Sequence, residues 1–350
     1  MIQRGRGFIL VLVLWVLLAL TIAASALAAW VSRTTDQAVL LADERRGQVD
    51  AADTMETLKF LFATRPTRVG GLYLGPAPLD LVRSWRQNPF SFPRGDTQGA
   101  DLPLDGRVWK GLGSTSFSLQ DENGLLNAQG FGKEQLEAWL GSVGISPLRT
   151  QGMVERLLDY TGDRRQITSF SSEYRSAGLE PPPFRFLLTP LEALKIMSWR
   201  ERKALLHENG WGGYAAVFAA GSMNLNTAPR ELLMQHPSMA VATARRVVGL
   251  RTQRPFRTAM EAARRVDGWV DEFSFITLPS DVLRLTVQPS DDARMLRYTL
   301  RLTARADAAQ PWRVEYFHPV QGATLGPSGL TGSVAASAEA VEHPLFTPSQ

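Results

Sequence analysis

The stretch "RGRGFILVLVLWVLLALTIAASALAAW", residues 4–30, decides how the rest of the chain is interpreted. Two arginines alternate with glycines, and the 23 residues from Phe8 to Trp30 carry no charged side chain. A helix of that length rises about 1.5 Å per residue and crosses the roughly 30 Å hydrocarbon core of a bilayer. Small residues at 24–28 also offer a signal-cleavage site, so composition alone leaves a removable signal and a permanent anchor open. Arg4 and Arg6 favour a cytoplasmic N-terminus, with everything after Trp30 on the far side.

The helical pattern continues beyond Trp30. Residues 33–65 contain no proline, and apolar residues recur there at helical spacing, with polar residues between them: Val39, Leu40, Ala42, Val49, Ala52, Met55, Leu58, Phe60 and Leu61. The sequence therefore predicts a single long helix. Its first part, residues 8–30, is apolar on all sides, and its second part, residues 31–65, is amphipathic.

The first residues carry a resemblance to a known family. A short basic leader that ends in Gly7 and is followed by Phe8 and an apolar helix resembles the class III leader of type IV pilins and type II secretion pseudopilins. In that family a membrane peptidase cuts after the glycine and methylates the new N-terminus. The resemblance implies cleavage between Gly7 and Phe8 and N-methylation of Phe8. Residues 1–7 would then be a cleaved basic leader, whereas the helix would stay on the protein.

One departure from the family pattern concerns the fifth residue after the predicted cut. Most subunits of the family carry a glutamate there, which is thought to pair with the N-terminal amine of the neighbouring subunit. Here the position is Leu12, and residues 8–30 contain no acid. A helix without this acid buries no charge in the membrane and cannot neutralise a subunit placed above it. Both properties suit a subunit at the tip, and among these pseudopilins the large K subunit is the one that lacks the acid.

Composition limits the chemistry available to the chain. It has 350 residues with 38 Lys+Arg against 34 Asp+Glu, a balance that lacks the dense positive field of a nucleic-acid binder. The absence of cysteine excludes disulfides, iron–sulfur clusters, thiolate zinc sites and cysteine nucleophiles. The histidines share no metal-ligand spacing: His207, His236, His318 and His343. We therefore predict a non-enzymatic protein without a cofactor or a small-molecule substrate.

The residue pattern after the long helix changes three times, between strand-type, helical and low-order segments. Residues 66–130 and 271–320 show strand patterns separated by turn residues, and 116–129 predicts a β-hairpin. Residues 297–303 alternate between polar and apolar, which predicts a half-buried antiparallel strand. Residues 131–270 show helical repeats of apolar residues. The tail, residues 321–350, is rich in Gly, Ser, Ala and Pro and is predicted to be poorly ordered.

This order predicts an α+β fold with a long N-terminal transmembrane helix and an inserted all-α domain. Residues 66–130 and 271–320 would form a pilin-like antiparallel sheet in two segments, and residues 131–270 would form the large insert. The arrangement is similar to the K pseudopilins, in which an all-helical domain interrupts the pilin-like sheet. The resemblance extends over nearly the whole chain, to about residue 320.

Residues 222–256 resemble a helix-hairpin-helix unit. Asn224 and Asn226 stand just before the helix that Pro229 begins, where their side chains could satisfy orphan backbone N–H groups. The turn at 236–240 lacks the glycines with which such units approach DNA phosphates. The following arginines nevertheless keep DNA in view: Arg245, Arg246, Arg251, Arg254 and Arg257. Nucleic acid is disfavoured, but a membrane-tethered DNA-binding protein of competence type stays as the alternative function, with a bitopic enzyme as a third class.

Two further motifs are assigned structural roles. "DENGLLN", residues 121–127, matches a hallmark of the K family, and its Asn-Gly pair predicts a tight turn. Its two carboxylates are expected to be too exposed for acid–base chemistry. The helical domain of the K family often binds calcium through a carboxylate-rich loop that follows a Leu-Leu-Asp-Trp motif. The matching stretch in this chain is residues 157–174. Asp159, Asp163 and Glu173 remain there, whereas calcium takes about six to eight oxygen ligands. Arg164 and Arg165 would also repel the calcium ion, so we predict that the site is lost.

The sequence is thus identified as a K-family minor pseudopilin of type II secretion. The resemblance implies an assembly subunit at the tip of the pseudopilus that supports protein export across the outer membrane. It also implies partners, namely the I and J minor pseudopilins, the major pseudopilin and the prepilin peptidase. The expected location is the bacterial inner membrane, as a single-pass protein with a cytoplasmic N-terminus and a periplasmic C-terminal domain.

Overall fold

The computed structural model falls into two compact units, Met1–Asp50 and Ala51–Gln350, and each is described here by itself. Four regions named in the sequence predictions lie wholly or partly outside the described residues: the start of the leader, part of the first strand segment, the middle of the candidate calcium loop and the tail. The structure describes residues 6–74, 101–162, 170–268, 270–290, 294–307 and 310–320.

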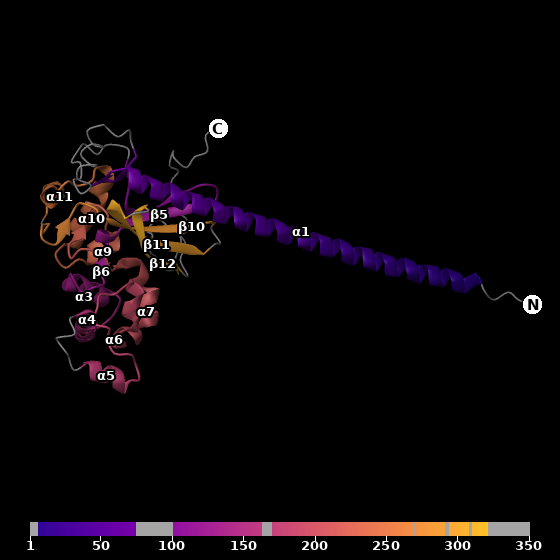
Figure 1. Cartoon of the computed structure of the whole chain (residues 1–350), viewed down its shortest axis with the longest axis horizontal. Coiled ribbons are helices and arrows are strands. Elements are labelled where there is room, and N and C mark those ends of the chain that lie inside the picture. The colour runs from indigo at the N-terminus through magenta and orange to yellow at the C-terminus, as the bar shows by residue number, and fades with distance from the viewer. Residues whose placement is uncertain are drawn as a thin grey trace, which may run out of the picture. The chain divides into compact units, whose positions relative to one another are not determined.

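Helix α1, Arg6–Thr64, is a continuous α-helix of 59 residues (Figure 1). The predicted continuation of the apolar helix past Trp30 is therefore confirmed. The helix ends just before Pro66, because a residue that precedes proline disfavours the helical backbone. The break comes where the chain turns into the first short strand, β1, Thr67–Arg68.

The central sheet of the second unit has five antiparallel strands in the order β12-β11-β10-β5-β4. Strand β5 comes before the helical region in sequence and strand β10 comes after it, yet every residue of β5 pairs with a residue of β10. Three shorter strands form a separate antiparallel sheet, and four two-residue strands form two parallel pairs, β6 with β7 and β8 with β9. The bounds are β1 Thr67–Arg68, β2 Gly71–Tyr73, β3 Asp101–Leu102, β4 Asp105–Lys110, β5 Ser116–Asp121, β6 Leu126–Asn127, β7 Ala215–Ala216, β8 Met223–Asn224, β9 Phe275–Ile276, β10 Val282–Gln288, β11 Met295–Asp307 and β12 Gln310–Val320.

One face of this sheet packs on the last turns of α1. Leu58 of the helix is fully buried in the same apolar cluster as Phe117 and Leu119 of β5 and Leu285 of β10. The register pairs Leu119 with Leu285, so side chains of the same face meet across the strands. Burying a leucine or phenylalanine side chain contributes about 1.5–3 kcal/mol, and this face supplies the stability that joins helix to sheet.

The opposite face of the sheet is also buried, which the sequence pattern did not predict. All seven residues of β10 are buried, including the polar residues Arg284 and Thr286. On β11, Arg297 is 5% exposed and Thr299 is fully buried. The prediction of a half-buried strand over 297–303 is therefore wrong for these two positions. Alternating polar residues indicate which side chains share a face, but they do not say whether that face meets water or another part of the protein.

The helical region has its own core, centred on three tryptophans. The ring of Trp211 lies 5.4 Å from that of Trp139 and 4.7 Å from that of Trp199, between centroids. The indole N–H groups of Trp199 and Trp211 donate to the carbonyls of Met153 and Pro190. The α-helices are α3 Lys133–Ser142, α4 Pro147–Thr161, α5 Phe170–Ser176, α6 Met197–Arg200, α7 Lys203–Glu208, α8 Trp211–Tyr214, α9 Arg230–Gln235, α10 Val241–Gln253 and α11 Ala259–Val266, with 3-10 helices at Glu122–Gly124 and Pro190–Lys195.

The architecture confirms the predicted fold class: an α+β protein with a long N-terminal apolar helix, an antiparallel sheet and additional helices. The predicted hairpin over 116–129 is wrong, because β5 pairs with β4 and β10, whereas β6 pairs in parallel with β7. Gly124 is needed there for close approach, since a Cβ at this position would lie 2.8 Å from the carbonyl oxygen of Thr227. The division into a two-segment sheet domain and an inserted helical domain with the stated boundaries stays a prediction.

Candidate functional site

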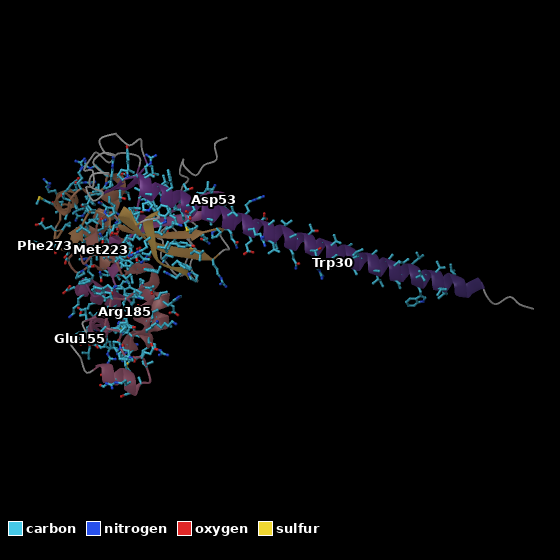
Figure 2. All side chains as sticks on the ribbon, viewed as in Figure 1. Trp30, Asp53, Glu155, Arg185, Met223 and Phe273 are labelled. Carbon is cyan, nitrogen blue, oxygen red and sulfur yellow. The ribbon has the colours of Figure 1, made fainter. Side chains whose placement is uncertain are left out.

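The first candidate site is the apolar part of α1. Among the described residues this is the one helix long and apolar enough to cross a membrane, and its most apolar stretch is not buried at all. The side chains of Leu10 and Trp30 are 69% and 63% exposed, and Figure 2 shows Trp30 projecting from the helix. So much exposed apolar surface is unusual for a protein face that meets water.

The polar groups of this stretch are satisfied within the helix itself. The Thr21 hydroxyl donates to the carbonyl oxygens of Leu17 and Leu18, and the Ser25 hydroxyl donates to Thr21 O. A membrane span needs such internal partners because hydrocarbon offers none. Leu12, at the predicted acid-free position, is 54% exposed. The predicted processing residues Gly7 and Phe8 lie in the first turns of α1, whereas the leader residues 1–5 lie outside the described part of the chain.

The second candidate site is a buried set of charged residues, here called the polar junction: Asp121, Glu122, Arg284, Arg297 and Tyr316. Asp121 closes β5 and caps the following 3-10 helix by accepting from Asn123 N at 3.1 Å. Its carboxylate also accepts from Asn224 Nδ2 and Thr227 Oγ1, both at 2.8 Å, and from Ser280 N at 2.8 Å. Asp121 thus gathers three separate stretches of chain around one buried side chain.

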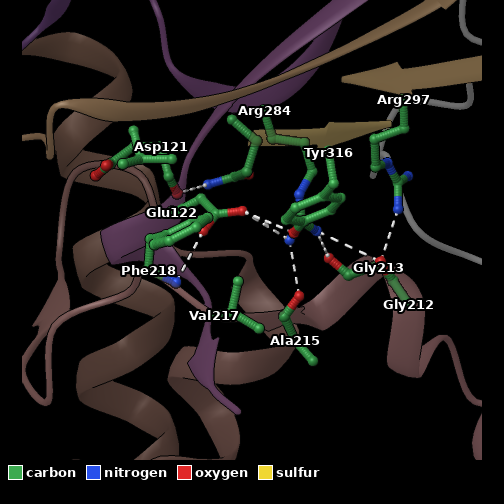
Figure 3. A network of polar contacts seen from close by, with 12 residues as sticks. Asp121, Glu122, Gly212, Gly213, Ala215, Val217, Phe218, Arg284, Arg297 and Tyr316 are labelled. Atoms are coloured by element: carbon green, nitrogen blue, oxygen red, sulfur yellow. Dashed lines mark hydrogen bonds and ion pairs between the residues drawn. The ribbon is translucent and has the colours of Figure 1, made fainter. Parts of the chain in front are cut away.

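Glu122 forms the charged centre of the polar junction. It is fully buried and pairs with Arg284, which is 3% exposed, at 3.2 Å. The same carboxylate accepts from Phe218 N at 3.2 Å and from the Tyr316 hydroxyl at 3.4 Å (Figure 3). Arg284 in turn donates to the carbonyls of Gly213 and Ala215, each at 2.7 Å. The pair therefore ties sheet strand β10 to the backbone of the helical region.

Arg297 extends the polar junction along strand β11. Its guanidinium donates to Thr286 Oγ1 at 3.1 Å and to Gly212 O at 2.8 Å, as Figure 3 shows for the latter contact. No carboxylate of the described residues lies within ion-pair distance of it. Burial, and then the neighbouring charge of Arg284, lower the pKa of Arg297 to about 9. Neutral oxygen atoms among the described residues offset part of the cost of burying the Arg297 charge. A shift of the Gly212 carbonyl would remove one of these hydrogen bonds and make the burial of the charge more costly.

The carboxylates of the polar junction are not set up for acid–base catalysis. Burial raises the pKa of both Asp121 and Glu122. The hydrogen bonds to Asp121 and the charge of Arg284 beside Glu122 act in the opposite direction but do not outweigh burial. Both groups nevertheless accept several hydrogen bonds from fixed donors. A general base needs reach to a substrate proton, and these oxygens are directed at the protein's own donors. The expectation that this pair is exposed is wrong, whereas its assignment to a structural role agrees with the geometry.

The polar residues of the helix-hairpin-helix-like stretch also act differently from the prediction. Helix α9 begins after Pro229 without a side-chain cap, so neither asparagine caps it. Asn224 donates to Asp121, and Asn226 instead donates to Phe256 O and Thr277 O while accepting from Phe256 N. Both amides hold loops together in the interior. The resemblance to a helix-hairpin-helix unit itself stays a prediction.

Several of the arginines that suggested DNA are committed within the protein. Arg251 is 9% exposed and donates to the carbonyls of Leu225 and Ala228. Arg246 donates to Val266 O at 2.7 Å, and Arg254 pairs with Glu261 at 2.7 Å. These three guanidinium groups therefore already bind acceptors within the protein, which makes them less available to a DNA phosphate.

The described residues contain no group of three or more His, Asp or Glu side chains arranged to hold a metal ion. In the candidate calcium stretch, Glu173 forms an ion pair with Arg156 at 2.9 Å. Asp163, Arg164 and Arg165 lie outside the described residues, so the predicted loss of a calcium site stays a prediction.

Comparison with known proteins gives a likeness in structure but none in sequence. No model of a known protein family matches the sequence, and no curated protein matches it. A chain in the crystal structure of the GspK–GspI–GspJ complex from the type 2 secretion system of enterotoxigenic Escherichia coli is similar, with 13% sequence identity and a TM-score of 0.42. The match covers 61% of this chain and 82% of that chain.

One local feature of the sequence points to the polar junction. An arginine in the middle of the apolar strand "VLRLTVQ" is a local conflict, because a central strand of that composition is expected to be buried. The conflict indicates a buried partner, and a nearby acid in the paired strand region is the obvious choice. Which acid it would be, and which carbonyls would complete the site, depends on contacts between residues up to 162 positions apart.

Proposed function

We propose that the protein is a minor pseudopilin of a type II secretion system, of the K kind, and that it acts without catalysis as an assembly subunit. The observation that carries the proposal is α1: one continuous helix whose first part is apolar and exposed and whose last turns pack on an antiparallel sheet. An exposed apolar helix suits a membrane and, later, a helical bundle, because packing between such helices depends on shape and close contact.

In this function the N-terminal segment is processed. The prepilin peptidase cuts between Gly7 and Phe8, removes the basic leader and methylates the amine of Phe8. The remaining helix anchors the subunit in the inner membrane, with the N-terminus cytoplasmic and the rest periplasmic, as Arg4 and Arg6 favour. Support comes from the unbroken helix through Phe8, which leaves a complete span after the leader is lost.

The position at the tip follows from two features of the chain. With Leu12 at the fifth position of the mature helix, the subunit offers no acid to an N-terminal amine above it. The helical region also enlarges the part of the subunit that carries the sheet, and we propose that this bulk prevents stacking of another subunit. The I and J minor pseudopilins would contact the long helix from the side, and the major pseudopilin would follow below.

Mass spectrometry of the mature N-terminus tests the proposal directly. We expect a methylated Phe8 whose appearance requires the peptidase. A Gly7→Val variant is expected to stay unprocessed in the membrane and to abolish secretion, because the peptidase needs a small residue before the cut. Gly5→Val is the matched control, since it changes the neighbouring glycine of the leader and is expected to be processed normally. An intact Met1, or a new terminus near Trp30, would refute the proposal.

A further inference from the structure

The net charge of the chain is concentrated in one short segment. Residues 241–270 contain seven arginines and two acids, a net charge of +5, whereas the whole chain carries +4. The other residues together therefore carry −1. A near-balanced total conceals a local positive field, and such asymmetry favours association with a partner of opposite charge.

This segment forms two helices that are fastened side by side, α10 and α11 (Figure 1). Arg246 of α10 donates to Val266 O at the end of α11. Arg265 of α11 donates to Arg254 O at 2.8 Å, just after α10, and lies over the Phe256 ring at 4.6 Å. Two arginines are thus used to hold the helices together, which fixes the remaining ones on a rigid support.

Exposed arginines and apolar side chains of the two helices and of the segment between them are here called the α10–α11 surface: Val241, Arg245, Arg254, Arg257, Met260 and Arg264. All six side chains are exposed. Arg245 and Arg264 form no ion pair with any described residue, while Arg254 shares Glu261 with Arg265. On α11 the exposed Met260 (59%) lies one turn from Arg264, and on α10 Val241 lies one turn from Arg245. The surface therefore combines unneutralised positive charge with exposed apolar side chains.

The chemistry of this surface suits an acidic protein better than a nucleic acid. A phosphate backbone is held by free backbone N–H groups at a helix turn. In the turn between α9 and α10, Ser238 N donates to His236 Nδ1 at 3.2 Å and Met239 N donates to His236 O at 3.1 Å. Two amides of this turn are therefore occupied within the protein. Exposed apolar side chains beside the arginines would gain from a protein partner with apolar groups of its own.

We propose that the α10–α11 surface is a docking site for an acidic protein segment that presents carboxylates and at least one apolar side chain. Arg245 and Arg264 supply charge to the carboxylates, and Met260 with Val241 supplies the apolar contact. Charge complementarity of this kind sets partner choice and the rate of encounter, and it weakens as salt screens the charges. The site would work whether or not the leader is cleaved.

Binding of defined probes to the full chain in detergent tests this site. The probes are a peptide of alternating Glu and Leu, a polyglutamate peptide of equal charge and a random DNA duplex. We expect the Glu/Leu peptide to bind most tightly and to lose affinity as salt rises from about 50 mM to about 0.5 M. The Arg245→Glu/Arg264→Glu variant should weaken that binding by about tenfold or more, and Arg245→Gln/Arg264→Gln by less.

The control variant is Arg149→Glu/Arg200→Glu, which makes the same charge change at two exposed arginines outside this surface. Equal loss in both double variants would refute the site, because the effect would then follow net charge alone. Tighter binding of DNA than of either peptide, lost in the same variant, would refute the acidic protein as partner. Repeating the measurement with Gly7→Val separates this test from leader processing, since that variant should bind normally.

Discussion

The apolar part of α1 and the polar junction reverse the usual distribution of residues in opposite ways. Leu10 and Trp30 are apolar and more than half exposed, whereas Glu122 and Arg284 are charged and almost completely buried. Each would be unfavourable if water and an apolar core were the only environments available. The exposed apolar helix is explained by an environment outside the protein, whereas the buried charges are explained by their partners inside it.

The comparison separates two kinds of evidence for function. An exposed apolar helix indicates an external environment, so its role is tested by moving it or by changing what it meets. A buried charged pair whose hydrogen bonds go to groups of the protein itself indicates an internal task, which here is to hold the sheet against the helical region. Breaking one partner of the pair should therefore damage the fold itself, whereas changing the apolar part of α1 should leave the fold of the second unit intact.

The largest effect is expected from Glu122→Ala. The substitution leaves the buried Arg284 without its carboxylate, and removing one partner of a buried pair costs about 3–5 kcal/mol. The free energy of unfolding of the full chain in detergent, followed by tryptophan fluorescence in urea, measures it. Glu122→Gln should cost less, because it keeps a hydrogen-bond acceptor. The exposed Glu134→Ala is the control, and equal stability of the Glu122 and Glu134 variants would contradict the internal role.

The next effect concerns the apolar helix. Leu18 lies near the middle of residues 8–30, where an arginine costs about 2.5–3.5 kcal/mol of membrane insertion. Leu18→Arg should therefore lower the fraction of protein that resists carbonate extraction, while Leu18→Ala should not. Unfolding of the second unit should be unchanged in both variants. If the arginine variant were extracted no more than wild type, this helix would not be a membrane span.

A smaller effect is expected from pH at the edge of the polar junction. Burial, followed by the charges of Arg297 and Arg284, lowers the pKa of His318 to about 4 from an ordinary value of 6.5. The unfolded chain then binds a proton at this histidine between pH 6.5 and 4 that the folded chain does not bind. The free energy of unfolding of wild type should fall through this window, relative to His318→Gln, by about 2 kcal/mol at most, because the ring is partly exposed. Urea unfolding of both proteins at pH 7, 5.5 and 4.5 measures the difference, and parallel pH profiles would contradict it.

Much of the fold follows from local sequence. The run at 8–30 predicted the apolar helix, and the strand patterns over 271–320 predicted the region in which strands β10, β11 and β12 lie. The predictions fail where contacts with a segment distant in the sequence determine whether a residue is buried. Asp121 was predicted in an exposed turn because nothing adjacent shows that Asn224, Thr227 and Ser280 surround it.

The positive α10–α11 surface illustrates the same limit from the opposite direction. The arginines were visible in the sequence, but their roles were not. Arg251 is buried among backbone carbonyls and Arg246 fastens two helices, whereas Arg245 stays exposed. Identical residue types at helical spacing therefore differ in function according to which face of α10 packs inward, and that face is set by segments elsewhere in the chain.

A last pair of variants, one of which is expected to be nearly neutral, compares the two regions by one and the same substitution. Thr227 donates its hydroxyl to Asp121 in the buried junction, and Thr21 donates its hydroxyl to its own helix in the apolar part of α1. Replacing each by valine keeps the shape and removes the hydroxyl. Thr227→Val leaves a buried carboxylate short of a donor and should cost about 1–3 kcal/mol of unfolding free energy.

Thr21→Val should be close to neutral, because its hydroxyl serves only carbonyls that already belong to the helix. Urea unfolding and carbonate extraction of both variants, side by side, give the contrast. A loss of stability in Thr21→Val as large as in Thr227→Val would mean that the apolar helix has a polar partner within the protein, and the distinction between an externally and an internally explained region would no longer hold.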